Sequence, residues 1–292
     1  MIRPLLLAIR PRQWVKNLSV GAPLLFAKSL LERDLALRAA AAVGVFCVIS
    51  SAVYLWNDLV DVEKDRAHPT KRNRPIAAGT LGMQAARAAA ASLAALGLAL
   101  ALLVDPGFAG AGLLYLLLNV AYSLVLKRIP YVDVLVIASG FLLRVWAGAM
   151  ATDVHPSPWL LLCTGLLASF LGFGKRAHEL AAAGAKGAEQ RSVLAAYRPE
   201  HLKAALYLTG AATVAAYFFY TLAEHTRVYF GTTKMVWTVP AVVVGIGRFL
   251  VLTSSRTKAE SPTEEILRDP LFMANLAGYA VAVVVIIYYF AQ

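Results

Sequence analysis

The densest charge in the chain lies in one short stretch, NDLVDVEKDRAHPTKRNRPIAAG, which begins at Asn57 and ends at Gly79. This stretch holds four acidic and five basic residues. If a helix continues through the acids, a step of about 100° per residue places Asn57, Asp58, Asp61 and Asp65 within an arc of about 100°. Mg²⁺ commonly binds one or two carboxylates together with substrate phosphates. These four residues are therefore the predicted metal ligands, and the three aspartates are predicted catalytic residues.

A basic turn stiffened by proline follows the acids. Its candidate ligands for phosphate oxygens are His68, Lys71 and Arg74, because arginine pairs bidentately with phosphate and lysine acts as a point charge. Tyr54 lies on the polar stripe that continues from Asn57 toward the membrane interior, and it is a predicted substrate contact. The alternative is a solvated loop in which the acids pair with the neighbouring bases.

The composition predicts a membrane protein. Of 292 residues, 59% are hydrophobic and 15% are charged, whereas about 25% are charged in an average soluble domain. A bilayer core of about 30 Å requires about 20 apolar residues per helix. Nine segments fit, at 16–31, 35–57, 82–104, 107–127, 131–151, 157–174, 203–223, 235–253 and 271–290. The expected fold is all-α, a polytopic membrane protein with one domain over residues 1–292.

The basic residues predict the topology, since Lys and Arg in short loops mark the cytoplasmic side. Of the 28 basic residues, 21 lie at the N-terminus and in alternate loops, five lie on the opposite side, and two lie inside spans. This distribution predicts a multi-pass protein of the inner (plasma) membrane with a cytoplasmic N-terminus, an external C-terminus and a cytoplasmic acid-rich loop. It also explains the net charge of +11 without nucleic acid as a partner. Cys47 and Cys163 lie inside apolar spans, so neither a disulfide framework nor a zinc site is expected.

Other polar residues lie toward the predicted cytoplasmic ends of later spans. Tyr122 and Lys127 end the fourth span, and Asp133 begins the fifth. Arg144 follows eleven residues after Asp133, which places the two about 20° apart around a helix. An arginine near the middle of the bilayer is costly unless it lines a wet cavity or meets an anion. Arg144 is therefore predicted to bind substrate, with a purely structural ion pair as the alternative.

The sixth span is followed by GKRAHEL, which supplies Lys175, Arg176 and Glu179 as candidates at a helix end that faces the cytoplasm. Ordinary anchoring by positive charge at the membrane surface is the alternative for the two bases. His178 in the same motif is expected to be solvated.

NDLVDVEKD, followed by HPTKRNRPIAAG, resembles the first aspartate-rich motif of the UbiA prenyltransferase superfamily. The resemblance spans the whole chain and implies nine helices around a cavity open to the cytoplasm, with Mg²⁺ as cofactor. Members normally carry a second acidic motif after the sixth helix, where this chain has GKRAHEL. That departure favours direct binding of an anion by Lys175 and Arg176 over a second Mg²⁺.

One branch of the superfamily, decaprenyl-phosphate phosphoribosyltransferase, resembles this chain further. The similar segments are RPRQWVKNLSVGAPLLFA at 10–27, YSLVLKRIPYVDVLVIASGFLLRVWAGA at 122–149, and GKRAHEL. The branch implies transfer of 5-phosphoribose from phosphoribosyl diphosphate to a polyprenyl (decaprenyl) phosphate, with release of diphosphate, in the synthesis of cell-wall arabinan precursors.

The resemblance also suggests roles for the remaining candidates. The bases expected to bind the two substrate phosphates are Lys127, Arg144, Lys175 and Arg176. Lys16 and Asn17 are candidates on the lipid side, and Asp133 is expected to hold a ribose hydroxyl or a metal-bound water.

Two other functions compete with this interpretation. One is a UbiA-type prenyltransferase with a prenyl diphosphate donor and an aromatic or polar acceptor, and the other is a lipid-phosphate transporter, since intramembrane charges also mark substrate pathways. The expected partners are the two substrates and membrane lipid, and a homo-oligomer is compatible with the sequence.

Overall fold

The longest helix is α3 (Arg33–Val60), and it provides the frame for the acid-rich stretch. It runs through 28 residues rich in Ala, Val and Leu, with no proline to interrupt its backbone hydrogen bonds. The computed structural model describes residues 2–183, 193–254, 266 and 268–290. These residues form helices and connecting loops with no strand among them, which confirms the all-α prediction.

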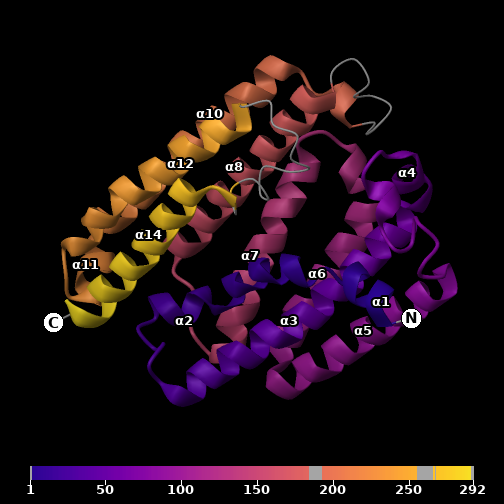
Figure 1. Ribbon diagram of the computed structural model, residues 1–292. Helices are drawn as coiled ribbons and strands as arrows, with labels where there is room; N and C mark the ends of the chain where they lie inside the picture. Colours follow the sequence, from indigo (N-terminus) through magenta and orange to yellow (C-terminus); the bar gives the residue numbers. More distant parts are fainter. Residues whose placement is uncertain (1, 184–192, 255–265, 267, 291–292) are drawn as a thin grey trace. The chain divides into compact units, whose positions relative to one another are not determined.

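The chain divides into two compact units, Met1–Pro156 and Ser157–Gln292, which we call the N-terminal and C-terminal units. The helices of the N-terminal unit, coloured indigo to magenta in Figure 1, are α1 (Ile2–Ala8), η1 (Pro11–Gly21), α2 (Ala22–Phe26), α3, α4 (Val62–Ala67), η2 (Lys71–Asn73), α5 (Met83–Val104), α6 (Pro106–Leu124), η3 (Leu126–Arg128) and α7 (Val132–Thr152). The single domain over residues 1–292 stays a prediction.

The core of the N-terminal unit lies around α3, which packs against η1, α5, α6 and α7. Phe46, Ile49 and Phe108 are fully buried there, beside Tyr115. Close approach of the helices depends on small residues, as in other membrane bundles. A Cβ added at Gly97 of α5 would lie 2.6 Å from the Ile49 side chain, so glycine is required at that contact.

The C-terminal unit consists of α8 (Pro158–Ala183), η5 (Leu194–Ala196), α10 (Pro199–Leu222), α11 (Glu224–Phe230), η6 (Lys234–Thr238), α12 (Val239–Ser254) and α14 (Pro270–Tyr289). Within it, α8 packs on α10, and α12 packs on α14. Asp269 caps α14 by accepting from the Phe272 N–H and also receives two hydrogen bonds from Arg248 of α12. These bonds tie the start of α14 to α12.

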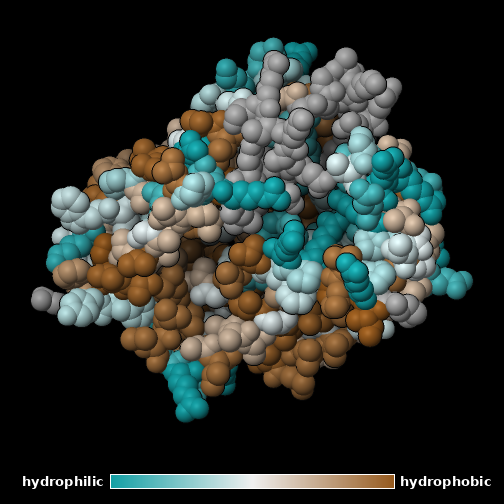
Figure 2. Space-filling model, viewed as in Figure 1, coloured by the Kyte–Doolittle hydropathy of each residue, from teal (hydrophilic) through white to brown (hydrophobic). Residues whose placement is uncertain are grey.

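Eight helices of the described chain are long and apolar enough to cross a membrane. They correspond to the second through ninth predicted spans. Large apolar side chains remain exposed on them, such as Leu103 on α5, Leu208 on α10 and Leu271 on α14. Figure 2 shows apolar surface over the long helices and hydrophilic side chains gathered over α4. This distribution is typical of helices whose outer faces contact lipid.

The first predicted span differs from the expected α-helix over 16–31, and the count of nine is not confirmed. The segment forms eleven residues of 3₁₀ helix in η1 and five residues of α-helix in α2. A 3₁₀ helix rises about 2.0 Å per residue, so η1 covers about 22 Å and α2 adds roughly 7 Å. Residues 11–26 are thus long enough for a core of about 30 Å, and a ninth crossing stays a prediction.

Candidate active site

The acid-rich stretch is nearly a continuation of α3, with a slight break at Asp61. α3 ends at Val60 and α4 begins at Val62, while Asp61 has φ −95° and ψ 8°. The backbone still donates from Asp61 to the Asn57 carbonyl and from Asp65 to the Asp61 carbonyl. The helical spacing used in the sequence prediction therefore applies approximately across the break.

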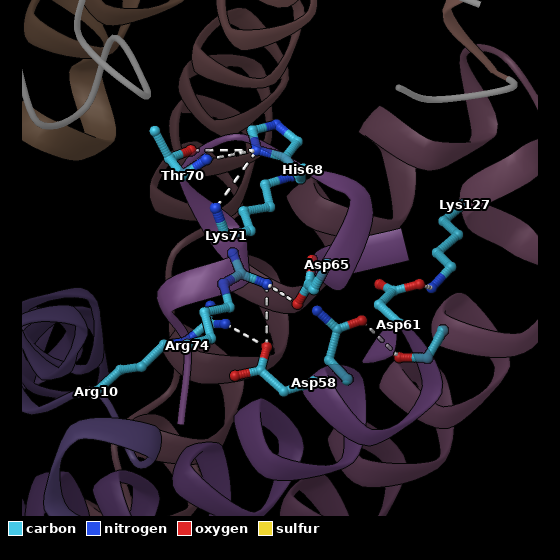
Figure 3. Close-up of polar contacts among 11 residues, drawn as sticks. Arg10, Asp58, Asp61, Asp65, His68, Thr70, Lys71, Arg74 and Lys127 are labelled. Carbon is cyan, nitrogen blue, oxygen red and sulfur yellow. Dashed lines mark hydrogen bonds and ion pairs between the residues drawn. The ribbon is translucent and has the colours of Figure 1, made fainter. Parts of the chain in front are cut away.

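One pair of acids faces a pair of arginines (Figure 3). Asp58 and Asp65 are seven residues apart, about 20° around a helix, and Arg74 Nη1 donates to both, at 3.1 Å and 2.7 Å. Arg10 donates to the same Oδ1 atom of Asp58. Asp58 is only 2% exposed, so these bonds stabilise a carboxylate that has little contact with solvent.

The other pair of ligand candidates faces α6 and η3. Lys127 Nζ donates to Asp61 at 2.6 Å, and Ser123 donates to Asn57 Oδ1 at 3.2 Å. Lys127 is buried, with 7% of its surface exposed. The structure therefore brings Lys127 to the acids, and it divides the four predicted metal ligands between two sets of partners.

Burial and charge act in opposite directions on Asp65, which lies on α4 beyond the end of α3. Burial raises the pKa of the Asp65 carboxyl above its ordinary value, while the charge and hydrogen bond of Arg74 lower it. Asp58 raises it further by like-charge repulsion, and Lys71 lowers it. The net shift is upward, because desolvation is the largest of these effects.

The turn after α4 is organised by its own side chains. His68 Nδ1 lies 3.3 Å from the Thr70 nitrogen and 3.4 Å from the Lys71 nitrogen, so it accepts from this backbone. Arg66 pairs with Glu63 and also reaches the Ala77 carbonyl. The bases of this stretch thus have different partners. Arg74 contacts the acids, whereas Arg66, which lies on α4, bonds a surface acid and the backbone.

Arg144 lies in a buried network deeper in the N-terminal unit. Its Nε donates to Asn17 Oδ1 at 2.9 Å, its Nη1 to the Gly140 carbonyl at 2.9 Å, and its Nη2 to the Tyr115 hydroxyl at 2.8 Å. Asn17 in turn donates to Ser50. Within the described residues Arg144 has no carboxylate partner, so the structural ion pair considered as an alternative is absent there.

The remaining candidates of the N-terminal unit lie at several places. Tyr54 is half-buried, and the Arg10 guanidinium carbon lies 5.5 Å from the centroid of the Tyr54 ring. Asp133 is fully buried in the first turn of α7, Tyr122 is half-buried on α6, and the Lys16 carbonyl accepts from Ser19 within η1. Their contacts with substrate stay predictions.

The GKRAHEL residues lie within α8 of the C-terminal unit, before its end at Ala183. Arg176 is fully buried and forms an ion pair with Glu179, three residues later. Lys175 is half-buried. His178 is 4% exposed, so the expectation that it is solvated is wrong. Arg176 and His178 are two residues apart, about 160° around the helix, and both are buried.

Arg10 is the residue that the sequence interpretation missed. Its position near the N-terminus predicts only a cytoplasmic charge. In the structure it lies between α1 and η1 with φ 54° and ψ 63°, a left-handed conformation that is unfavourable for a residue with a side chain. The Ser51 hydroxyl donates to the neighbouring Ile9 carbonyl, and Trp14 donates to Ser51. A conformation of this kind persists where surrounding contacts hold it, and here they direct Arg10 to Asp58.

The model of the UbiA prenyltransferase family matches residues 18–276. The chain belongs to the UbiA prenyltransferase family. Like other members of this family it is an enzyme of the transferase class.

Two curated relatives resemble the chain over most of its length. A decaprenyl-phosphate phosphoribosyltransferase of Mycolicibacterium smegmatis is 39% identical over 221 residues, 74% of this chain and 70% of the relative. The protein of the same name from Mycobacterium tuberculosis (strain H37Rv) is 40% identical over 214 residues, 72% of this chain and 71% of the relative.

A solved structure shares the fold. The UbiA homologue of Archaeoglobus fulgidus bound to DMAPP and Mg²⁺ matches with a TM-score of 0.72 and 20% identity, over 98% of this chain and 99% of the homologue. At this identity the likeness shows the UbiA fold and leaves the substrate open.

Proposed function

We propose that this UbiA-family enzyme transfers 5-phosphoribose from phosphoribosyl diphosphate to a polyprenyl phosphate, such as decaprenyl phosphate, and releases diphosphate. The observation that carries the proposal is the set of contacts around the acids, in which Asp58, Asp61 and Asp65 each bond a base. A diphosphate requires cations, and this site combines carboxylates that can bind a metal with bases that can bind phosphate directly. The names of the relatives support the same substrates.

Mg²⁺ fits the oxygen atoms of Asn57, Asp58, Asp61 and Asp65. Among the described residues no three acidic, histidine or cysteine side chains form a cluster that could hold a metal by itself. Mg²⁺ requires fewer protein ligands than such a cluster, because it commonly binds one or two carboxylates and completes its coordination shell with substrate phosphates and water. The site therefore suits a complex of Mg²⁺ with a diphosphate, and the metal when bound would neutralise charge on the leaving group.

The bases of the site can act on the same diphosphate. Arg10, Arg74 and Lys127 bond carboxylates that a bound metal would also use, so metal binding would leave their N–H groups available to phosphate oxygens. Arginine offers a planar pair of donors and lysine a compact charge. Positive charge placed where the diphosphate leaves would stabilise the transition state more than the ground state.

The transfer itself requires little proton chemistry. An oxygen of the lipid phosphate attacks C1 of the ribose, the C1–O bond to diphosphate breaks, and its electron pair leaves with the diphosphate. A phosphate monoester is already ionised near neutral pH, with a second pKa of about 6, so a strong general base is unnecessary. Orientation of the two substrates should therefore contribute more than proton transfer.

The other predicted contacts extend this proposal. Arg144, Lys175 and Arg176 would hold the 5-phosphate or the lipid phosphate, Asp133 a ribose hydroxyl or metal-bound water, and Lys16 and Asn17 the lipid side. Tyr54, His68, Lys71, Tyr122 and Glu179 complete the substrate-binding set. Asn17 is fully buried and bonded to Arg144, which favours an indirect role for it.

We also propose that the protein lies in the inner (plasma) membrane with its N-terminus and acid-rich loop in the cytoplasm and its C-terminus outside. The distribution of basic residues supports this orientation. A water-soluble donor such as phosphoribosyl diphosphate would reach the acids from the cytoplasm, and the polyprenyl acceptor from the bilayer. The product would supply the precursors of cell-wall arabinan.

A prenyl diphosphate donor is the second candidate. The homologue with DMAPP and Mg²⁺ has the same fold, and an acid cluster with adjacent bases would suit either diphosphate. GKRAHEL favours the phosphoribosyl donor, since buried Arg176 stands where the family normally has acids. A transporter is less favoured, because the chain belongs to an enzyme family.

The decisive experiment is a transfer assay with purified protein, Mg²⁺, phosphoribosyl diphosphate labelled in the ribose, and a polyprenyl phosphate. We expect label in the organic phase, loss of it with Asp61→Asn, and retention with Glu63→Gln. Glu63 is a suitable control because it lies in the same stretch, is 78% exposed, and pairs with Arg66 alone among the described residues. If folded protein transfers no ribose but transfers a labelled prenyl group from its diphosphate, the second candidate replaces the first.

A further inference from the structure

A polar pocket lies in the C-terminal unit, and none of the candidate site residues lines it. It is formed by the end of α11, the turn into η6, and Tyr289 and Phe290 at the end of α14. In Figure 1, α11 lies beside the end of α14. Its volume is about 410 Å³, within the range of small-molecule sites. The residues that supply its polar groups are Arg227, Thr232, Thr233 and Lys234.

Among the residues that the structure describes, those that line the pocket carry positive charge and no acid. None of its lining residues is acidic, and Glu224 is the only acidic residue between positions 223 and 238. Within the described part of the chain neither Arg227 nor Lys234 forms an ion pair. Lys234 is held in place by Phe290, with its Nζ 3.7 Å from the ring centroid. Two cations line this pocket, and no carboxylate is among its described lining residues, so the pocket favours an anion.

The backbone brings the two bases together. α11 ends at Phe230, and Gly231 takes a left-handed conformation with φ 64°, which glycine adopts without strain. The Lys234 nitrogen then donates to Thr232 Oγ1 at 3.2 Å. This tight turn places Lys234 close to Arg227, which lies in the last turn of α11. Two threonine hydroxyls between the bases add hydrogen-bond donors of the kind that phosphate accepts.

The surroundings favour the surface of a membrane. Tyr289, which lines the pocket, is 83% exposed, and Trp237, three residues after Lys234, is 76% exposed. Exposed Trp and Tyr at the ends of apolar helices mark the level of lipid headgroups. The topology expected from the sequence places only five bases on this side of the membrane, so two of them in one pocket need a specific reason.

We propose that this pocket binds the phosphate group of an anionic phospholipid whose acyl chains lie against the apolar surface of α14 and α12. Arg227 pairs with phosphate oxygens through its planar donors, and Lys234 adds a point charge steadied by Phe290. The site is separate from the transferase reaction and does not depend on the identity of its substrates.

The test uses the full-length protein in a neutral detergent, with bound lipid counted by native mass spectrometry. Phosphatidylglycerol and phosphatidylcholine are the lipid probes, and inorganic phosphate is the soluble competitor. We expect Arg227→Gln with Lys234→Gln to weaken phosphatidylglycerol binding on the order of tenfold, since each base near a lipid surface contributes measurably. Arg33→Gln with Arg38→Gln is the matched control, because it removes the same charge from exposed bases of α3.

Each outcome has a distinct meaning. Preferential binding of phosphatidylglycerol that only the pocket variant loses supports the proposal, and equal binding by both double variants overturns it. Full displacement of the lipid by inorganic phosphate overturns the lipid assignment and identifies a site for soluble phosphate. If the pocket variant does not fold, Arg227→Lys with Lys234→Arg keeps both charges and should bind phosphatidylglycerol as the unmodified protein does, while Lys234→Gln alone should bind it more weakly.

Discussion

Arg74 joins Asp58 to Asp65 through a single nitrogen, which donates to both carboxylates at 3.1 Å and 2.7 Å. The two acids lie on either side of the break in the helix at Asp61. Arg74 therefore ties the end of α3 to α4 and offsets the repulsion between two carboxylates. A cation that binds these two acids would therefore compete with Arg74 for their oxygen atoms.

The first prediction concerns the pH dependence of metal binding at Asp65. Burial raises the pKa of this carboxyl and Arg74 lowers it, so Arg74→Met should raise the pKa further. Because a divalent cation competes with the proton, Mn²⁺ affinity should fall as the pH drops through the pKa, and the midpoint should move to higher pH in the variant. Electron paramagnetic resonance of bound Mn²⁺ measures this midpoint. Arg72→Met is the control, since Arg72 is exposed in the same turn.

The pH dependence of folding stability from Asp65 has the opposite sign to that of an acid whose pKa is lowered by a salt bridge. A raised pKa means that the folded chain holds the proton more tightly than the unfolded chain does. On this group alone, stability is greatest at low pH and decreases as the pH rises through the two pKa values. A Mn²⁺ midpoint that is the same in Arg74→Met and in Arg72→Met would contradict the assignment of Arg74.

A second prediction concerns Arg10. Arg10→Gln removes one of the two guanidinium groups that bond Asp58, a carboxylate that is only 2% exposed. Hydrogen bonds to buried charged groups contribute roughly 1.5–3 kcal/mol, so the variant should unfold at a lower temperature and bind Mg²⁺ with diphosphate more weakly. Arg12→Gln, an exposed base two residues later, should change neither property. Thermal unfolding and calorimetric titration measure the two effects, and equal behaviour of both variants would refute the role of Arg10.

Residue types and helical spacing predicted much of the site. The seven-residue separation of Asp58 and Asp65 predicted that they share a face, and they share Arg74. Lys127 was predicted at the end of a span and meets Asp61. The first result follows from local periodicity, because helical backbone hydrogen bonds continue from α3 into α4 across Asp61. The second joins η3 to the end of α3 over 66 residues, so it depends on the packing of the helices.

What spacing could not provide were contacts set by the tertiary fold. Arg10 is 48 residues from Asp58, and in the sequence it is indistinguishable from a base that anchors the chain at the membrane surface. The neutral partners of Arg144, which are Asn17 and Tyr115, likewise come from distant segments, and its binding of substrate stays a prediction. The sequence also does not predict the 3₁₀ form of η1, since the length of an apolar segment does not distinguish a 3₁₀ helix from an α-helix.

A third prediction tests the close approach of α7 to η1. A Cβ at Gly148 would lie 1.7 Å from the Val20 carbonyl oxygen, so Gly148→Ala must push the two segments apart. Overpacking of this kind costs about 1–3 kcal/mol, and more where backbone must move. Gly110→Ala on α6 is the control, because an added Cβ meets no described atom within 4 Å. We expect a lower unfolding temperature for Gly148→Ala and an equal or higher one for Gly110→Ala, as alanine favours helix.

The last prediction tests whether residues 11–26 cross the membrane. η1 and α2 together cover about 30 Å, enough for the hydrocarbon core, although they contain too few residues for a crossing made of α-helix alone. In a background without Cys47 and Cys163, single cysteines at Arg12, Glu32 and Lys64 can be labelled by an impermeant maleimide in vesicles of either orientation. If the segment crosses, Arg12→Cys and Lys64→Cys react from one side and Glu32→Cys from the other, because α3 returns the chain across the membrane. Reaction of Arg12→Cys and Glu32→Cys from the same side would mean that η1 and α2 lie along one face and that the chain crosses eight times.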